Sequence, residues 1–293
     1  MKKKIINLIK LACTKNLFLK KLVFFFIKRK VAYNYYRKPL SLINQYAWLD
    51  NERSNFYYDL TDLNKIHLAN TISLITGTEY TTVLNYFSEL LNNKDLYDYL
   101  NDSLKNFPNS IKNFANYGSE ISFAYGRRLG WYAIARIIKP KVIIETGVDL
   151  GIGSCVLSSA LLMNKSEGFE GKYIGTEINL QAGKLYKEPY NSVGKIIYGD
   201  SIKTLNKIEK KIDLFINDSD HSSEYEYNEY LSIKEKLSNN SFILGDNSHV
   251  TDCLPKFSKI SKRNFIFFQE KPKNHWYPGA GIGISFQNSL NNQ

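Results

Sequence analysis

Three glycines follow a short apolar run in the stretch Lys141–Ser154, which reads KVIIETGVDLGIGS. The letters VII are typical of a buried strand, and Gly147, Gly151 and Gly153 would let the backbone approach a ligand closely. Free N–H groups at the start of the following helix would face a nucleotide-like ligand. The stretch therefore predicts a ligand-binding βα turn, and an ordinary tight turn is the alternative.

Acidic residues and their neighbours follow the other four runs that we expect to be parallel strands. They are Glu177, then Asp200 with Ser201, then Asp218 with Asp220 and His221, and finally Asp246 with Asn247. In open α/β sheets, ligands bind beyond the carboxyl ends of the strands, so these side chains should gather at one edge. Any one of them could instead cap a helix, and this alternative applies most directly to Asp200 and Ser201.

Three of the four histidines lie in loops that we expect at the same edge. Histidine has a pKa of about 6.5, so it can accept a hydroxyl proton near neutral pH. We take His221 as the first candidate general base and His249 as the second, with a structural histidine as the alternative for each. His275, Trp276 and Tyr277 could stack on a sugar ring as substrate contacts, or they could pack within their own loop.

Strand and helix patterns alternate from about residue 119. Strands are expected at 141–145, 173–178, 195–198, 212–217 and 242–245, and helices at 121–138, 154–164, 202–210 and 223–237. This alternation predicts a parallel sheet with helices on both faces. Two further runs, 264–269 and 281–287, are joined too closely for a helix crossover and should pair antiparallel. We expect an α/β fold, a Rossmann-like doubly wound seven-stranded sheet, mostly parallel with an antiparallel C-terminal strand.

Charge divides the 293-residue chain unevenly. Residues 1–49 hold twelve Lys and Arg and no acid, although the whole chain has a net charge of +11. We therefore expect a basic amphipathic arm over 1–49, a helical cap or accessory segment over 50–118, and the catalytic domain over 119–293. The three cysteines are widely spaced and indicate neither a disulfide framework nor a zinc site, which suits the cytoplasm.

The arm itself, over residues 1–38, mixes lysines with large apolar side chains but holds no 18-residue apolar span. Such a segment can lie on an anionic membrane surface, which would make the protein peripheral on the inner face of the membrane. A helix packed on the protein and a nucleic-acid-binding arm are the alternatives.

The glycine turn, followed by Glu177 and Asp200, resembles class I S-adenosylmethionine-dependent methyltransferases over residues 119–288. It does not match the spacing of the dinucleotide fingerprint. The resemblance implies that the turn lines the methionine and ribose of the cofactor, that Glu177 binds the ribose hydroxyls, and that Asp200 binds the adenine amino group. The full cofactor-binding set would be Glu145, Gly147, Val148, Gly151, Gly153, Ser154, Glu177, Asp200 and Ser201.

Asp218, Asp246 and Asn247 resemble the metal-binding residues of metal-dependent catechol and caffeoyl-coenzyme A methyltransferases. The resemblance implies a Mg²⁺ site built from oxygen ligands. Such a metal would lower the pKa of a substrate hydroxyl, with Asp218 as another candidate base. The alternative is that these residues cap helices and bind substrate without a metal.

Asp220-His221-Ser222 resembles the D-x-D-H-S segment of bacterial methyltransferases that act on sugars or antibiotic precursors. We therefore expect an S-adenosylmethionine-dependent O-methyltransferase whose acceptor is a small-molecule or sugar hydroxyl, such as a surface-glycan precursor, with Asp220 contacting that acceptor. The rivals are a nucleic-acid methyltransferase and a non-catalytic scaffold of this fold. The first is disfavoured because no Asn/Asp-Pro-Pro-Tyr/Phe motif follows the fourth strand. A homo-oligomer stays an open possibility.

Overall fold

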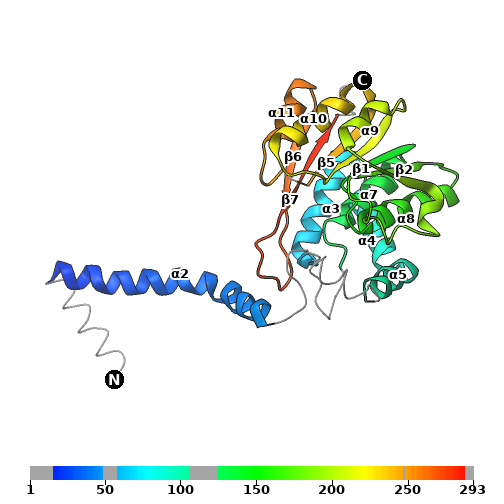
Figure 1. The fold of residues 1–293 in the computed structure, drawn as a ribbon. Helices are drawn as coiled ribbons and strands as arrows, with labels where there is room; N and C mark the ends of the chain where they lie inside the picture. Colours follow the sequence, from blue (N-terminus) through cyan, green and yellow to red (C-terminus); the bar gives the residue numbers. More distant parts are fainter. Residues whose placement is uncertain (1–15, 49–57, 106–123, 247, 288–293) are drawn as a thin grey trace. The chain divides into compact units, whose positions relative to one another are not determined.

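The computed structural model describes residues 16–48, 58–105, 124–246 and 248–287 (Figure 1). The chain divides into two compact units, one formed by residues 1–50 with 274–277 and the other by 51–273 with 278–293. The sheet and all helices after α2 belong to the second unit. Because residues 62–105 lie in that unit, the expected accessory segment and the sheet share one compact body.

The first unit is dominated by one long helix, α2 (Leu17–Trp48), which carries seven Lys and Arg residues and none of whose side chains is buried. Large apolar side chains are exposed along it; the Phe18 side chain, for example, is 75% exposed. The ring of Tyr46 lies 5.0 Å from that of Trp276, which joins residues 274–277 to the helix. Among the described residues, no helix has the length and apolar character needed to cross a membrane.

The second unit is built on a seven-stranded sheet with strand order β3-β2-β1-β4-β5-β7-β6. The strands are β1 (Val142–Thr146), β2 (Lys172–Glu177), β3 (Gly194–Tyr198), β4 (Ile212–Asn217), β5 (Leu237–Gly245), β6 (Asn264–Gln269) and β7 (Gly281–Phe286). The first five run parallel, and β7 pairs antiparallel with both β5 and β6. The predicted fold class is therefore confirmed.

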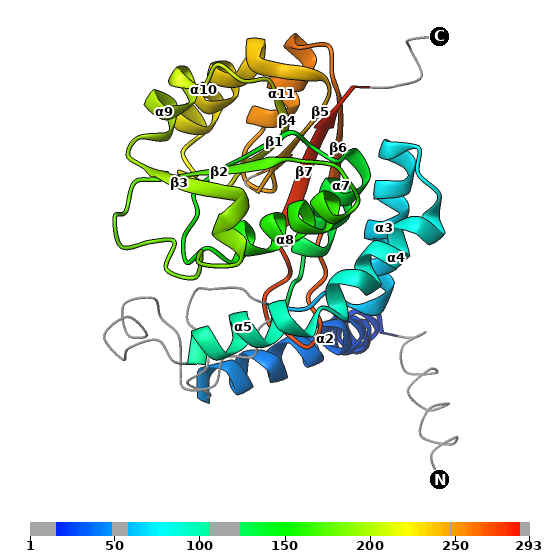
Figure 2. The ribbon, with the colours of Figure 1, turned by 90° about the vertical axis from the view of Figure 1, so that its right-hand side faces the viewer.

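Helices cover both faces of the sheet (Figure 2). One face carries α7 (Arg128–Ile138) and α8 (Ile152–Ser166), and outside them pack α3 (Asp62–Thr76), α4 (Tyr80–Leu91) and α5 (Lys94–Lys105). The other face carries α9 (Ser201–Lys207), α10 (Ser223–Ile233) and α11 (Cys253–Ile260). Short 3-10 turns, η1 (Tyr190–Val193) and η2 (Lys234–Lys236), precede β3 and β5. The core between the sheet and α9–α11 consists of buried apolar residues such as Phe215, Tyr230, Ile243 and Phe257.

One buried charge group ties the outer helices to the sheet. The Arg136 side chain on α7 is 2% exposed, and its Nε donates to Oε1 of Glu89 on α4 at 2.7 Å. The same guanidinium also donates to Asn164 and Glu167 at the end of α8. A buried arginine must be paired, because an unpaired buried charge is costly. The pairing of the Arg136 guanidinium therefore depends on α4, α7 and α8 packing together.

Several predicted boundaries are wrong. The helix expected at 121–138 starts only at Arg128, because Gly126 adopts a left-handed φ of 53° just before it; residues 121–123 lie outside the described residues. The helix expected at 223–237 ends at Ile233, and β5 starts at Leu237 rather than at residue 242. The helix expected at 202–210 ends at Lys207, where Ile208 turns extended.

Candidate active site

The glycine turn is held against the end of β2. Backbone N–H groups of Val148 and Asp149 donate to Oε2 of Glu177 at 3.0 Å each, and Asn179 N donates to its Oε1 at 2.8 Å. Gly147 has φ 79°, and a Cβ placed there would overlap the carbonyl oxygen of Asp218. Only glycine fits such a position, because it combines a left-handed backbone with close approach to another strand end. The structure thus brings the predicted turn, Glu177 and Asp218 together.

Gly151 and Gly153 open helix α8 over a buried carboxyl group. Gly151, at φ 99°, is the N-cap of the helix, and a Cβ on Gly153 would collide with the Glu145 carboxylate. Glu145 is 2% exposed and accepts a hydrogen bond from Ser154 Oγ at 3.1 Å and another from the Tyr173 hydroxyl. Burial raises its pKa from 4.5 to about 7, although the hydrogen bonds from Tyr173 and Ser154 act to lower it. The structure therefore places Glu145 and Ser154 beneath the turn.

Asp200 and Ser201 are engaged in local structure. Asp200 is the N-cap of α9, and its Oδ1 accepts from Lys203 N at 2.8 Å. The Ser201 hydroxyl is buried and donates to Oε1 of Glu229. The helix-cap alternative is thus what the structure shows for Asp200, and the predicted adenine contact stays a prediction.

Glu229, on α10, joins the ends of β1 and β4 and the start of α9. Its Oε2 accepts from Ser219 Oγ at 2.7 Å, from Thr146 Oγ1 at 3.2 Å and from the Asn217 side-chain amide. The residue has no exposed surface, and burial raises the pKa of its carboxyl group. Because it contacts the ends of β1 and β4 and, through Ser201, the start of α9, Glu229 fixes the loops that carry the predicted site residues.

Asp218 and Asp246 converge as predicted, and a guanidinium lies beside them. Arg127, just before α7, places its Nε 2.6 Å from Asp246 Oδ1 and a terminal nitrogen 3.9 Å from Asp218 Oδ2. The other terminal nitrogen lies 3.9 Å from Oε1 of Glu270, which is fully buried at the end of β6 and accepts from the Tyr58 hydroxyl. The close contact with Asp246 is an ion pair without hydrogen-bond alignment. Three carboxylates thus surround one arginine.

The surroundings in this cluster raise the pKa values of Asp218, Glu270 and Arg127. Burial and the negative charge of Asp246 raise the pKa of Asp218 well above its ordinary value, while Arg127 acts to lower it. Burial also raises the pKa of Glu270, against the opposing charge of Arg127. Burial alone would lower the pKa of Arg127, but the charges of Asp246, Glu270 and Asp218 outweigh it and raise that pKa. Arg127 therefore stays charged, and the raised pKa of Asp218 makes its carboxyl group a candidate to exchange a proton.

The predicted Mg²⁺ site stays a prediction. No three His, Cys, Asp or Glu side chains in the described part of the chain are placed to hold a metal ion. Asp246 Oδ1 lies 2.6 Å from Nε of the Arg127 guanidinium, so the arginine would compete with a metal ion for that oxygen. The third predicted ligand, Asn247, lies outside the described residues.

The predicted histidines and substrate contacts are spread over two units. Asp220 and His221 lie exposed on the loop after β4, and the Asp220 carboxylate accepts from Ser222 N at 2.7 Å, which lowers its pKa. His249 lies after β5, with Nδ1 3.0 Å from the Asp246 carbonyl oxygen. His275, Trp276 and Tyr277 belong to the unit of α2, where the three rings pack in sequence, so their predicted contact with substrate stays a prediction.

Sequence reasoning missed Arg127, Glu229 and Glu270. Two arginines in a row at a helix start oppose the helix dipole, which is a usable signal that carboxylates lie nearby. Glu229 falls four residues before buried Ile233 and therefore on the buried face of α10, although the acidic sequence of that helix is typical of a solvated face. Glu270 carried no signal, because it follows an edge strand at the start of a loop.

Comparison with known proteins identifies the domain. Residues 144–248 match a family model described as a methyltransferase domain, and this confirms the predicted resemblance to methyltransferases. No curated protein matches the chain.

Among solved structures, the chain is similar to SAH-bound methyltransferase PaMTH1 from Podospora anserina, at 18% identity and a TM-score of 0.47, over 67% of this chain and 88% of that one. It is also similar to an O-methyltransferase from Bacillus cereus in complex with SAH, at 14% identity and a TM-score of 0.46, over 69% and 96%. A third similar structure is the O-methyltransferase TomG from Streptomyces achromogenes in complex with SAM, at 12% identity and a TM-score of 0.45, over 67% of this chain and 96% of that one. All three likenesses are distant.

Proposed function

Because residues 144–248 match a methyltransferase-domain model, we propose that this chain is an S-adenosylmethionine-dependent O-methyltransferase. The observation that carries the proposal is the meeting of three features where the strand order reverses between β1 and β4. These are the glycine turn with Glu177, the high-pKa carboxyl group of Asp218 and the fixed charge of Arg127. Ligands of doubly wound sheets bind at such a switch point.

We propose that the cofactor lies along the turn from Gly147 to Gly153 and reaches Glu177. A carboxylate has about four acceptor positions, and the backbone of the turn and of Asn179 uses three at Glu177. One position is left for a ribose hydroxyl, so the predicted contact with both hydroxyls requires Asn179 or a turn N–H to be displaced. Asp200 remains available through Oδ2, which accepts from Tyr225 at 3.2 Å.

S-adenosylmethionine supplies a methyl group on a positively charged sulfur. Asp218, when ionised, would take the proton of the acceptor hydroxyl. As the oxygen forms its bond to the methyl carbon, the bond between that carbon and the sulfur would break, and S-adenosylhomocysteine would leave with a neutral sulfur. A base works best when its pKa lies near the working pH, and burial beside Asp246 moves Asp218 in that direction. His221 and His249 are the alternative bases, on the exposed loops after β4 and β5.

Arg127 takes, in this proposal, the place that the sequence assigned to Mg²⁺. Its charge holds Asp246 and lies near Asp218, where negative charge develops on the acceptor oxygen. The expected activity is unaffected by a chelator. If activity disappears in EDTA and returns with Mg²⁺, the metal prediction stands and this assignment of Arg127 is wrong.

The acceptor we propose is a hydroxyl on a sugar or sugar-lipid precursor. Two features support it: the exposed Asp220-His221-Ser222 segment after β4, and the aromatic group His275–Tyr277. The exposed apolar and basic side chains of α2 support attachment to an anionic membrane surface. Sedimentation with vesicles tests this attachment. We expect the protein to bind anionic phosphatidylglycerol vesicles and not phosphatidylcholine vesicles.

The central experiment is a calorimetric titration of S-adenosylmethionine into the full chain, with NAD as the control ligand. Binding of the former at micromolar concentration and no binding of NAD are expected. Glu177→Ala should abolish the binding, and Glu224→Ala, an exposed acid on α10, should not change it. Equal affinity of the Glu177 variant would remove this residue from the site, and no binding to the wild type would favour a non-catalytic scaffold.

A further inference from the structure

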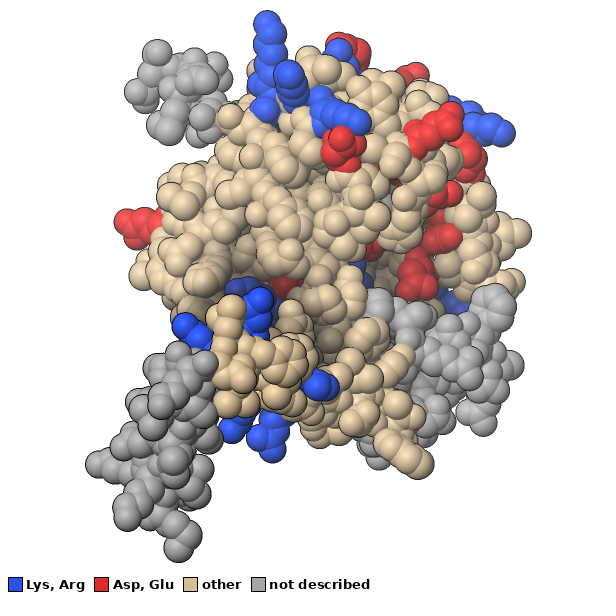
Figure 3. All heavy atoms as spheres, turned by 90° about the vertical axis from the view of Figure 1, so that its left-hand side faces the viewer, with Lys and Arg blue, Asp and Glu red and all other residues tan. Residues whose placement is uncertain are grey.

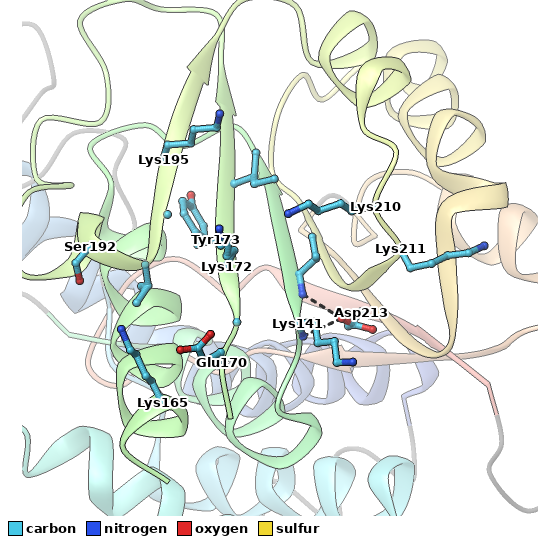
Figure 4. Close-up of a pocket in the computed structure, with 15 residues that line it drawn as sticks. Lys141, Lys165, Glu170, Lys172, Tyr173, Ser192, Lys195, Lys210, Lys211 and Asp213 are labelled. Carbon is cyan, nitrogen blue, oxygen red and sulfur yellow. Dashed lines mark hydrogen bonds between the residues drawn. The ribbon is translucent and has the colours of Figure 1, made fainter. Parts of the chain in front are cut away.

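A second hollow opens at the edge of the sheet opposite the candidate active site, where β1, β2 and β3 begin (Figure 4). Its volume is about 910 Å³. Val142, Ile174 and Val193 contribute an apolar floor, and the ends of neighbouring helices and loops form the walls. A volume of roughly 300–1,000 Å³ is usual for a small-molecule site, so the hollow can take a ligand of nucleotide size.

Six lysines, from five parts of the chain, line this hollow. They are Lys141, Lys165, Lys172, Lys195, Lys210 and Lys211. In Figure 4 the side chains of Lys172 and Lys210 point toward the space between them, whereas that of Lys211 points away. Lys211 donates to the carbonyl oxygen of Glu235 at 2.9 Å. Lys211 is therefore engaged with the protein itself.

Little negative charge compensates these lysines. Only two acids line the hollow, Glu170 and Asp213, and Asp213 Oδ2 already accepts from the backbone N–H groups of Lys141 at 2.9 Å and Val142 at 3.0 Å. None of the six lysines takes part in a salt bridge among the described residues. Like charges around one hollow repel one another, so an anion bound there relieves that repulsion.

The positive charge is also local. Outside the first 49 residues the chain holds 27 basic and 28 acidic side chains, so this part of the protein is close to neutral overall. Charge is sorted over its surface, as Figure 3 shows for another face, where acidic side chains gather along one side. Six of the 27 basic residues thus surround one hollow.

We propose that this hollow binds a phosphate-bearing ligand, at a site separate from that of methyl transfer. Lysine acts toward phosphate as a mobile point charge, whereas planar carboxylates are matched better by arginine, and the hollow contains lysines alone as its bases. The apolar floor suits the uncharged body of such a ligand. The phosphate could belong to a soluble polyphosphate compound or to a lipid headgroup, and a volume of about 910 Å³ is too small for duplex nucleic acid.

The test is calorimetric titration of inorganic pyrophosphate into the full chain and two variants. Lys172→Glu with Lys210→Glu reverses the two charges that face each other across the hollow. Lys234→Glu with Lys259→Glu, on the surface outside it, makes the same change in net charge and serves as the matched control. We expect the first variant to bind at least about tenfold more weakly, because each charge-assisted hydrogen bond is worth about 1.5 kcal/mol or more. The control should bind like the wild type.

The thermal unfolding midpoint and S-adenosylmethionine binding report whether the variants fold. If Lys172→Glu with Lys210→Glu does not fold, the milder glutamine pair at the same positions replaces it. Equal pyrophosphate affinity in all three proteins, or no binding to the wild type, overturns the proposal. Since the lysines lie at the edge opposite the active site, these results are independent of whether methyl transfer is confirmed.

Sedimentation with phosphatidylglycerol vesicles then separates the two sources of phosphate. Vesicle binding that is weaker in the hollow variant than in its control assigns the hollow to a lipid headgroup. Equal vesicle binding, together with weakened pyrophosphate binding, assigns it to a soluble phosphate compound. The basic arm is identical in all three proteins, so its own attraction to vesicles cancels in the comparison.

Discussion

Glu145→Gln should change how the stability of the protein depends on pH. Glu145 is buried beneath the glycine turn, and burial raises its pKa from 4.5 to about 7. The amide of glutamine has nearly the same shape and can still accept from Ser154 and Tyr173, but it does not titrate. The substitution therefore removes the ionisation and keeps the packing.

The magnitude follows from proton linkage. Between its unfolded pKa of 4.5 and its folded pKa of about 7, Glu145 holds a proton in the folded protein that it has lost in the unfolded chain. The free energy of unfolding therefore falls as pH rises through this window and levels off above it. At about 1.4 kcal/mol for each pKa unit, the whole fall is about 3 kcal/mol, and about 2.5 kcal/mol of it lies between about pH 5 and about pH 8.

The assay is urea unfolding of the wild type, Glu145→Gln and Glu209→Gln, at those two pH values. Glu209 is an exposed glutamate, and its substitution by glutamine removes one carboxyl group, as Glu145→Gln does. The free energy of unfolding of Glu145→Gln, taken relative to that of the wild type, should increase by about 2.5 kcal/mol from the lower to the higher pH. If all three proteins lose stability in parallel, the buried Glu145 does not hold the proton and the argument fails.

Three more substitutions test other parts of the structure. Gly147→Ala puts a Cβ onto the Asp218 carbonyl at a left-handed φ, and it should weaken S-adenosylmethionine binding at least about tenfold by calorimetry. Arg127→Met leaves the surrounding carboxylates without their cation, which should cost about 3 kcal/mol in urea unfolding. The melting temperature of the same variant should rise when Mg²⁺ is added, because the metal ion can replace the lost cation. A melting temperature that does not change with Mg²⁺ would contradict the role of Arg127. Arg263→Met removes a buried guanidinium that donates to Ser241 and Ser285, and it should cost about 2 kcal/mol, because several acceptors lose their donor; a loss below about 0.5 kcal/mol would show that water replaces it.

The sequence predicted what repeats along the chain. Strand, turn and acid recur in the same order, so the positions of Glu177, Asp218 and Asp246 at one edge followed from the alternation of elements. The 212–217 strand was placed at its observed ends for the same reason. The glycine turn was recognisable because positive φ and close approach leave glycine as the residue of choice at Gly147.

What could not be predicted depends on contacts between distant segments. Arg127 meets Glu270 across more than a hundred residues, and nothing local to either marks the other as its partner. Helix α10 was read as longer than it is, because the pattern of apolar residues continues past Ile233 into the first residue of β5. The metal site stays a prediction, because Asn247 lies outside the described residues, and the resemblance in three positions did not point to the arginine that lies beside Asp218 and Asp246.

Arg136 has a consequence for where this protein can be shortened. Composition divides the chain near residue 118, but the guanidinium of Arg136 lies on one side of that division and its Glu89 partner on the other. A fragment that starts at residue 119 would leave the buried positive charge with part of its hydrogen bonds unmade, and would expose the apolar face that α3 and α4 cover. The smallest fragment that can be expressed as a folded catalytic domain therefore starts ahead of Tyr58, whose hydroxyl donates to Glu270.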